Sequence, residues 1–151
     1  MDTLTKYNLQ RSLGYRMTYV ARLNERRFEG LIAEHDLSRL AWCVLCALEY
    51  EDLSRPSDIA DFIGVDRAAI SRVIGQMESK GLITRRLISG DARARAIEIT
   101  ALGRERLAGG TAAAADNAEH LRAQLTVEEY AALDAIMTKL MKGDGSPLKG
   151  L

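Results

Sequence analysis

The sequence predicts a mainly α-helical fold with one small β-hairpin. Apolar residues recur at helical spacing along most of the 151 residues, and two short β-like runs flank a Gly-Asp turn. Hydrophobic residues make up 47% of the chain and charged residues 28%, which is typical of a globular protein. This length fits one domain, or one compact domain with extra helices for self-association.

A long helix is expected within residues 1–35. Its apolar residues recur at steps of three to five positions: Leu9, Leu13, Met17, Val20, Leu23, Phe28 and Leu31. An apolar stripe of this length needs a partner, which is either another long helix or a second chain. Asp36 or Ser38 caps the next helix. That helix is mostly apolar and is expected to be buried, with Leu40, Trp42, Val44, Leu45 and Leu48.

Two short helices joined by a glycine turn follow. Pro56 favours the first turn of a helix over Ser57–Ile63, and Gly64 ends that helix. Asp66 is a good N-cap for a second helix over Arg67–Lys80. The buried face of this second helix carries Ile70, Val73 and Met77. The arrangement is a helix-turn-helix, in which the second helix contacts the bases when the partner is DNA.

Two β-like runs, 82–88 and 94–99, come next and are joined by residues 89–93. The Gly-Asp turn between them predicts a hairpin. A helix-turn-helix followed by a β-hairpin is a winged helix, and we assign it to residues 36–100.

Two further helices are expected after the hairpin. Thr100 caps one over 101–124, and Gly109-Gly110 predicts a bend or a close helix crossing within it. A capping box at 126–129 opens the last amphipathic helix, which runs to Met141. The chain therefore divides into an N-terminal helix (1–35), the winged helix (36–100), C-terminal helices (101–142) and a flexible tail (143–151).

The charge of the chain is unevenly distributed, although it sums to zero. Residues 67–106 carry nine Lys and Arg against four Asp and Glu, whereas both flanking segments are acidic. A basic middle segment is typical of a protein in which one element faces phosphate. The longest apolar run, 41–48, is too short to span a membrane, and no secretory signal is visible, which predicts a cytoplasmic protein.

Cys43 and Cys46 form a C-x-x-C pattern that invites a redox or zinc interpretation. The pair lies in an apolar helix, and His35 and His120 are the only imidazoles of the sequence. Tetrahedral zinc needs several such ligands to converge, so we expect no metal and no cofactor. Buried apolar cysteines are the default, and a cysteine-based redox sensor is the alternative. A Ser/His/Asp set and a phosphate loop are absent from the sequence, so an enzyme is not indicated.

Three stretches resemble the MarR family of winged-helix transcriptional regulators. The first is the helix-turn-helix over 58–72, and the second is the run from Met77 to Arg85, with Gly-Leu-Ile-Thr-Arg at its end. The third, 91–103, fits the family's wing pattern from Asp91 to Thr100 and Gly103. The resemblance covers nearly the whole chain and implies a homodimer whose base comprises the first helix and last two helices of both chains. Two recognition helices would then enter successive major grooves about 34 Å apart on a pseudo-palindrome.

The resemblance implies that the second helix of the motif contacts DNA. Its face opposite the buried residues carries Arg67, Ala68, Ser71, Arg72 and Gln76. Arg72 can bind phosphate or guanine, Ser71 a base edge or phosphate, and Gln76 phosphate. Ala68 and Ala69 stand where relatives often carry Ser or Thr, so base specificity rests partly on DNA shape.

Arg93 is the strongest single candidate for DNA contact. At the wing tip it would enter a narrow minor groove, and Asp91 resembles the family's acidic partner that holds this arginine. Arg95 is either a second phosphate contact or a plain strand residue. Arg85 and Arg86 are weaker candidates, because charged strand residues are commonly exposed for solubility.

Members of the family often respond to small aromatic or acidic ligands bound between the dimer base and the winged helix. The candidate residues for such a site are Tyr15, Arg16, Tyr19, Arg22, His35 and Trp42. An aromatic wall with one cation would suit an aromatic carboxylate or a thioester. The same residues also fit a packed helix junction whose polar ends are satisfied.

We therefore expect a dimeric, sequence-specific regulator that binds double-stranded DNA, as a repressor that a ligand releases from its operator. The alternative is a winged helix that contacts only proteins. The basic middle segment and Arg93 argue against it, because a protein-binding wing needs no arginine for a minor groove.

Overall fold

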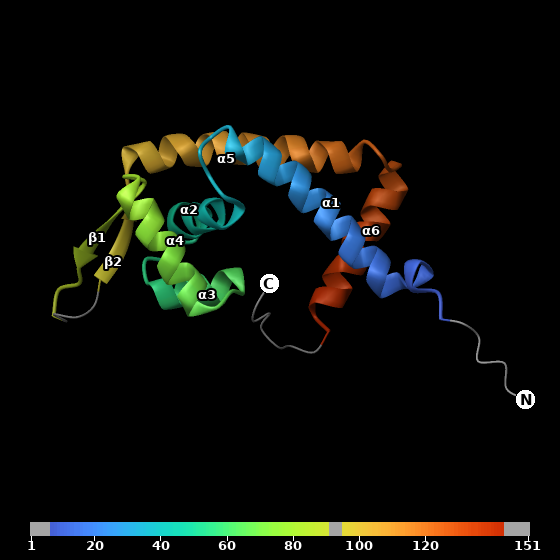
Figure 1. The fold of residues 1–151 in the computed structure, drawn as a ribbon, viewed down its shortest axis with the longest axis horizontal. Helices are drawn as coiled ribbons and strands as arrows, with labels where there is room; N and C mark the ends of the chain where they lie inside the picture. The colour runs from blue at the N-terminus through green and yellow to red at the C-terminus, as the bar shows by residue number, and fades with distance from the viewer. Residues whose placement is uncertain (1–6, 91–94, 144–151) are drawn as a thin grey trace, which may run out of the picture.

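The computed structural model describes residues 7–90 and 95–143. It consists of a small lobe, one long helix that follows the lobe, and a further helix at each end of the chain. The helices are α1 (Leu13–Ala33), α2 (Arg39–Tyr50), α3 (Pro56–Ile63), α4 (Arg67–Ser79), α5 (Ala101–Arg122) and α6 (Val127–Met141), with a 3-10 turn at Leu9–Arg11. Strands β1 (Ile83–Leu87) and β2 (Arg95–Ile99) form an antiparallel hairpin. In Figure 1 the lobe of α2, α3, α4 and the hairpin lies at the N-terminal end of α5, and α6 leaves its C-terminal end. The predicted fold class, a winged helix with flanking helices, is confirmed.

Side chains cap the helices where the sequence predicted. Ser38, and not Asp36, caps α2, because its hydroxyl accepts from the Ala41 N–H at 3.1 Å. Asp36 instead takes a positive φ of 53° in the turn before α2. The capping box of Thr126 and Glu129 at the start of α6 is present with both of its hydrogen bonds.

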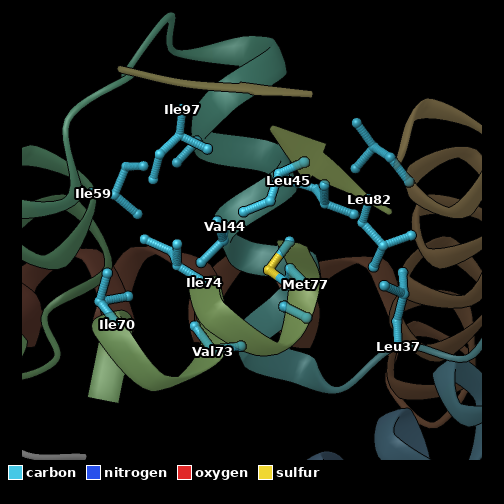
Figure 2. Close-up of a cluster of buried hydrophobic side chains, with 14 of the residues drawn as sticks. Leu37, Val44, Leu45, Ile59, Ile70, Val73, Ile74, Met77, Leu82 and Ile97 are labelled. Atoms are coloured by element: carbon cyan, nitrogen blue, oxygen red, sulfur yellow. The ribbon is translucent and has the colours of Figure 1, made fainter. Parts of the chain in front are cut away.

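The core of the lobe forms around α2. Figure 2 shows Val44 and Leu45 of α2 facing Ile74 and Met77 of α4. The cluster also contains Leu37, Ile59, Ile70, Val73, Leu82 and Ile97. β2 is further tied to the connection between α2 and α3, because the Ile97 N–H donates to the Ser54 carbonyl at 2.8 Å. The core therefore fixes α4 and the hairpin relative to each other.

The apolar stripe of α1 has little cover within the chain. Of the seven residues predicted for it, only Phe28 is buried and Leu31 is half-buried. α6 has no buried residue at all in the part of the chain that the structure describes. Two helices with apolar faces thus lie open to solvent.

The Gly109-Gly110 pair marks a close helix crossing and not a bend, because α5 is continuous through it. A Cβ on Gly109 would overlap the imidazole of His35, and one on Gly110 would lie 2.5 Å from Cδ1 of Trp42. Glycine at these two positions lets the start of α2 approach the axis of α5.

Candidate nucleic-acid interface

The open face of α4 carries all five residues predicted for it. They are exposed in the structure: Arg67, Ala68, Ser71, Arg72 and Gln76. The opposite face buries Ile70, Val73, Ile74 and Met77, none of them more than 6% exposed. Within the described residues, neither Arg67 nor Arg72 pairs with a carboxylate. Two guanidinium groups on one open helix face are therefore available to bind phosphate or guanine.

The turn before α4 sets where this face begins. Gly64 adopts a φ of +81°, and the N–H groups of Gly64 and Val65 both donate to the Ala60 carbonyl, at 2.9 and 3.1 Å. Asp66 then caps α4 by accepting from the Ala69 N–H at 2.7 Å. Because the chain reverses here, the first turn of α4 stands at the edge of the lobe.

Ion pairs hold the other end of α4. Lys80, the residue after α4, donates to Asp36 at 2.9 Å, and this hydrogen bond lowers the pKa of the Asp36 carboxyl. Glu78 accepts from Arg85 of β1 at 2.9 Å. Exposed ion pairs add little stability, so their effect here is on orientation: they link the end of α4 to the turn before α2 and to the hairpin.

Both arginines of β1 have acidic partners. Arg85 pairs with Glu78 as described, and Arg86 pairs with Glu98 of β2 at 2.6 Å. Thr84 lies opposite Glu98 in the antiparallel register, so the Arg86 contact crosses the hairpin diagonally. These pairs neutralise much of the positive charge of β1, which favours the interpretation of Arg85 and Arg86 as solubilising residues.

Arg95 is exposed at the first residue of β2, opposite Leu87. The two wing-tip candidates, Asp91 and Arg93, lie outside the described residues. Their roles as minor-groove arginine and acidic partner stay predictions.

The six candidate ligand residues fall into two groups at opposite ends of α1. Near its N-terminus the rings of Tyr15 and Tyr19 stack with centroids 6.4 Å apart. Both line a hollow of about 440 Å³ together with Arg22. Arg16 is exposed on the same helix but does not line this hollow.

The second group, His35 and Trp42, packs against α5. Trp42 meets Phe28 edge to face with ring centroids 5.2 Å apart, and its Nε1 donates to the Thr111 hydroxyl at 3.5 Å. His35 lies against Gly109. Within one chain these two residues therefore form a packed junction of α1, α2 and α5, and the tyrosine hollow lies elsewhere.

A polar cluster between α1 and α5 was not predicted. Asn117, only 7% exposed, donates to the Asn24 side chain at 2.8 Å and accepts from Arg27 at 3.3 Å. Arg27 also reaches Asp116 at 3.4 Å. Beside the cluster lies a mainly apolar hollow of about 340 Å³. The only signal in the sequence was an asparagine within an alanine-rich helix, and it does not indicate a partner 93 positions away.

Comparison with known proteins shows a likeness to one family. The sequence profile of the MarR family matches residues 35–94. Over 64 residues the chain is 36% identical to YdgJ, an uncharacterized HTH-type transcriptional regulator of Bacillus subtilis (strain 168). The winged helix of the chain thus resembles that of the MarR family. The match with YdgJ spans 42% of this chain and 39% of YdgJ itself.

Two solved structures extend the likeness beyond the winged helix. The organohalide-sensing transcriptional regulator RdhR, with 2,4-dichlorophenol bound, superposes with a TM-score of 0.82 at 20% identity, over 95% of this chain and 86% of that one. A cysteine-to-serine mutant of MarR from E. coli, in complex with operator DNA, superposes with a TM-score of 0.77 at 22% identity. The superposition covers 85% of this chain and 92% of that one. At these identities the likeness establishes the fold, including the flanking helices.

The two cysteines of the chain are half-buried on α2. Burial raises the pKa of both thiols, that of Cys46 to about 11, where the neighbouring Cys43 raises it further. The thiolate is the form that reacts with oxidants and alkylating agents, so a raised pKa makes these thiols slow to react at neutral pH. This argues against the redox-sensor alternative.

Alkylation of the folded protein with iodoacetamide at pH 7.5 is expected to be slow at both cysteines. A rise of the Cys46 pKa from 9.0 to about 11 lowers its thiolate fraction about hundredfold. Mass spectrometry of the labelled protein, compared with labelling in denaturant, measures the difference. Equal rates in both conditions would contradict the burial argument and revive the redox interpretation.

The described residues of the chain, 7–90 and 95–143, form six α-helices. No helix among them is both long and apolar enough to cross a bilayer.

Proposed function

We propose that the chain is a homodimeric transcriptional regulator of the cytoplasm that binds a pseudo-palindromic operator in double-stranded DNA. The open basic face of α4 on a MarR-family winged helix is the observation that carries this proposal. Arg67 and Arg72, which pair with no carboxylate among the described residues, suit phosphate and guanine, and the winged helix (36–100) would place one α4 in each of two major grooves. The fold shared with the DNA complex of E. coli MarR supports the same docking.

The exposed apolar faces of α1 and α6 support a dimer. Large apolar side chains that are 37–70% exposed occur on both helices: Leu13, Met17, Val20, Leu23, Tyr130, Ile136, Met137 and Leu140. Contiguous exposed apolar surface marks an interaction site. We assign residues 1–35 and 101–142 to the dimer base, where a second copy would cover these faces.

Replacing Ile136 by glutamate is expected to convert the dimer to a monomer, because the carboxylate would be buried without a partner in the interface. Light scattering coupled to size-exclusion chromatography measures the mass. Thr138→Glu adds the same charge on the opposite side of α6 and is expected to remain a dimer. If the Ile136 variant also remains a dimer, α6 is not part of the interface.

A small aromatic or acidic effector would relieve repression by stabilising a conformer whose two α4 helices no longer match the operator. The dichlorophenol bound to the structurally similar RdhR supports an aromatic ligand. The tyrosine hollow beside Arg22 offers stacking and one cation for such a molecule.

Selection of bound fragments from the source genome tests the proposal. Purified dimer is mixed with fragmented genomic DNA at near-physiological salt, and the retained DNA is sequenced. The expected result is one pseudo-palindrome whose half-sites are about one helical turn apart. Retention of no enriched sequence by a protein shown to be dimeric would overturn the proposal.

A further inference from the structure

Most side chains along the centre of the open face of α4 are short. Successive residues at helical spacing along it are Ala68, Arg72, Gly75 and Ser79, all exposed. Ser71 and Gln76 lie on either side of this line. Arg72 is therefore the single long side chain on the central line, and two positions that flank it carry a methyl group or only hydrogen.

Gly75 has no explanation within the described part of the chain. A glycine inside a helix lowers helix stability relative to alanine. Its φ is not in the left-handed region, and a Cβ built on it would meet no atom within 4 Å. Neither backbone conformation nor packing thus requires glycine here. A glycine on an exposed helix face leaves room for another molecule to approach the backbone closely.

Ala68 lies seven residues before Gly75, about 10 Å away along the helix. Its methyl group is exposed in the first turn of α4, the part of a recognition helix that contacts base edges. A major-groove methyl group of this kind packs against the 5-methyl of thymine, and arginine binds the O6 and N7 acceptors of guanine.

We infer that Ala68 and Gly75 are specificity-determining residues of the DNA interface. Gly75 lets the duplex approach the backbone of α4, and this close docking brings the Ala68 methyl onto a thymine beside the guanine that Arg72 binds. The inference rests on the proposed function and names bases that the operator half-site must contain.

Gly75→Ala tests the close approach, because it changes stability and DNA binding in opposite directions. Alanine is the better helix former, so the thermal unfolding midpoint is expected to rise by about 2–4 °C. The added methyl would lie between helix and duplex, so operator affinity is expected to fall about tenfold. Fluorescence anisotropy on the selected operator measures the affinity. Unchanged or tighter binding overturns the role of Gly75.

Gly30→Ala is the matched control. Gly30 is also exposed and helical, and a Cβ there would meet no atom within 4 Å, but it lies on α1 and not on the DNA-facing helix. Because α1 is assigned to the dimer base, light scattering first checks that this variant is still a dimer. The same rise in midpoint is expected, with no loss of operator affinity.

Thymine-to-deoxyuridine substitution tests the role of Ala68, because it removes only the 5-methyl group. At the contacted position the parent protein is expected to lose about fourfold in affinity for each half-site. Ala68→Gly, which has no methyl to offer, is expected to bind both operators equally. A thymine-to-uracil ratio that is the same for parent and variant overturns the inference, as does a selected half-site without thymine next to the guanine.

These outcomes separate the inference from the proposed function. If no DNA sequence is selected, the proposed function is wrong. If a clear operator is selected but uracil lowers the affinity of the parent and of the Ala68→Gly variant equally, only the inference about Ala68 is wrong.

Discussion

Replacing Arg72 by alanine is expected to weaken operator binding by at least about thirtyfold. Arg72 lies at the centre of the open face of α4 and has no acidic partner among the described residues. A bidentate arginine–guanine contact contributes about 1–3 kcal/mol of discrimination, and a dimer would lose two of them. Titration of the selected operator and of an unrelated duplex measures both affinities.

The loss is expected mainly in sequence-specific binding. Binding to the unrelated duplex depends on phosphate contacts and on salt, so it should change far less. Arg26→Ala removes the same charge from the exposed surface of α1 and is the control. If both variants lose equally little operator affinity, Arg72 does not contact a base. If the Arg72 variant binds both duplexes more weakly and to the same extent, Arg72 contacts phosphate.

Replacing Gly103 by alanine is expected to destabilise the protein by at least about 2 kcal/mol. A Cβ at this position would overlap the carbonyl oxygen of Leu82 and lie 2.8 Å from Cγ1 of Ile99. Because the obstructing oxygen belongs to the backbone, no side-chain rotation can make room. Denaturant unfolding at one fixed protein concentration measures the loss, since the stability of the proposed dimer would depend on concentration.

Gly14→Ala is the control for this prediction, because Gly14 is helical with open space around it. That variant is expected to be as stable as the parent or slightly more stable. A Gly103→Ala protein that unfolds at the same denaturant concentration as the parent would show that α5 can move away from Leu82 without cost.

The position of Gly103 explains the Thr-x-x-Gly part of the wing pattern. The Thr100 hydroxyl accepts from the Gly103 N–H at 3.0 Å and contacts the Gly81 and Leu82 carbonyls at 2.6 and 3.0 Å. The Thr100 N–H donates to Leu82 as well, at 3.1 Å. One threonine thus caps α5 and joins it to the turn after α4, and the glycine provides the space that this contact needs.

The sequence predicted the features that depend on neighbouring residues. The cap at Asp66, the left-handed turn at Gly64 and the capping box at Thr126 were all found, because each is a hydrogen bond or backbone preference within four positions. The start of α4 and its exposed face followed from the same short-range pattern. The geometry that presents Arg67 and Arg72 could therefore be anticipated.

Features that depend on how helices pack against each other were harder to predict from the sequence. The tyrosines and Trp42 seemed to form one aromatic wall, but α2 packs against the far end of α1, so the two groups are separate. Gly109 and Gly110 allow a close crossing, which low helix propensity alone does not distinguish from a bend. The buried Asn117 depends on Asn24 and Arg27 of another helix.

The continuity of α5 through that crossing has a mechanical consequence. An unbroken helix of 22 residues is a stiff rod about 33 Å long, and the crossing at Gly110 lies about 14 Å from the end that holds the winged helix. A rotation of about 10° at the crossing would swing that end by about 2.4 Å, most of a base-pair step of about 3.4 Å. In the proposed dimer, with one rod in each protomer, opposite swings would add. A slight tilt beside His35 and Trp42 would thus put two recognition helices out of register with successive turns of DNA.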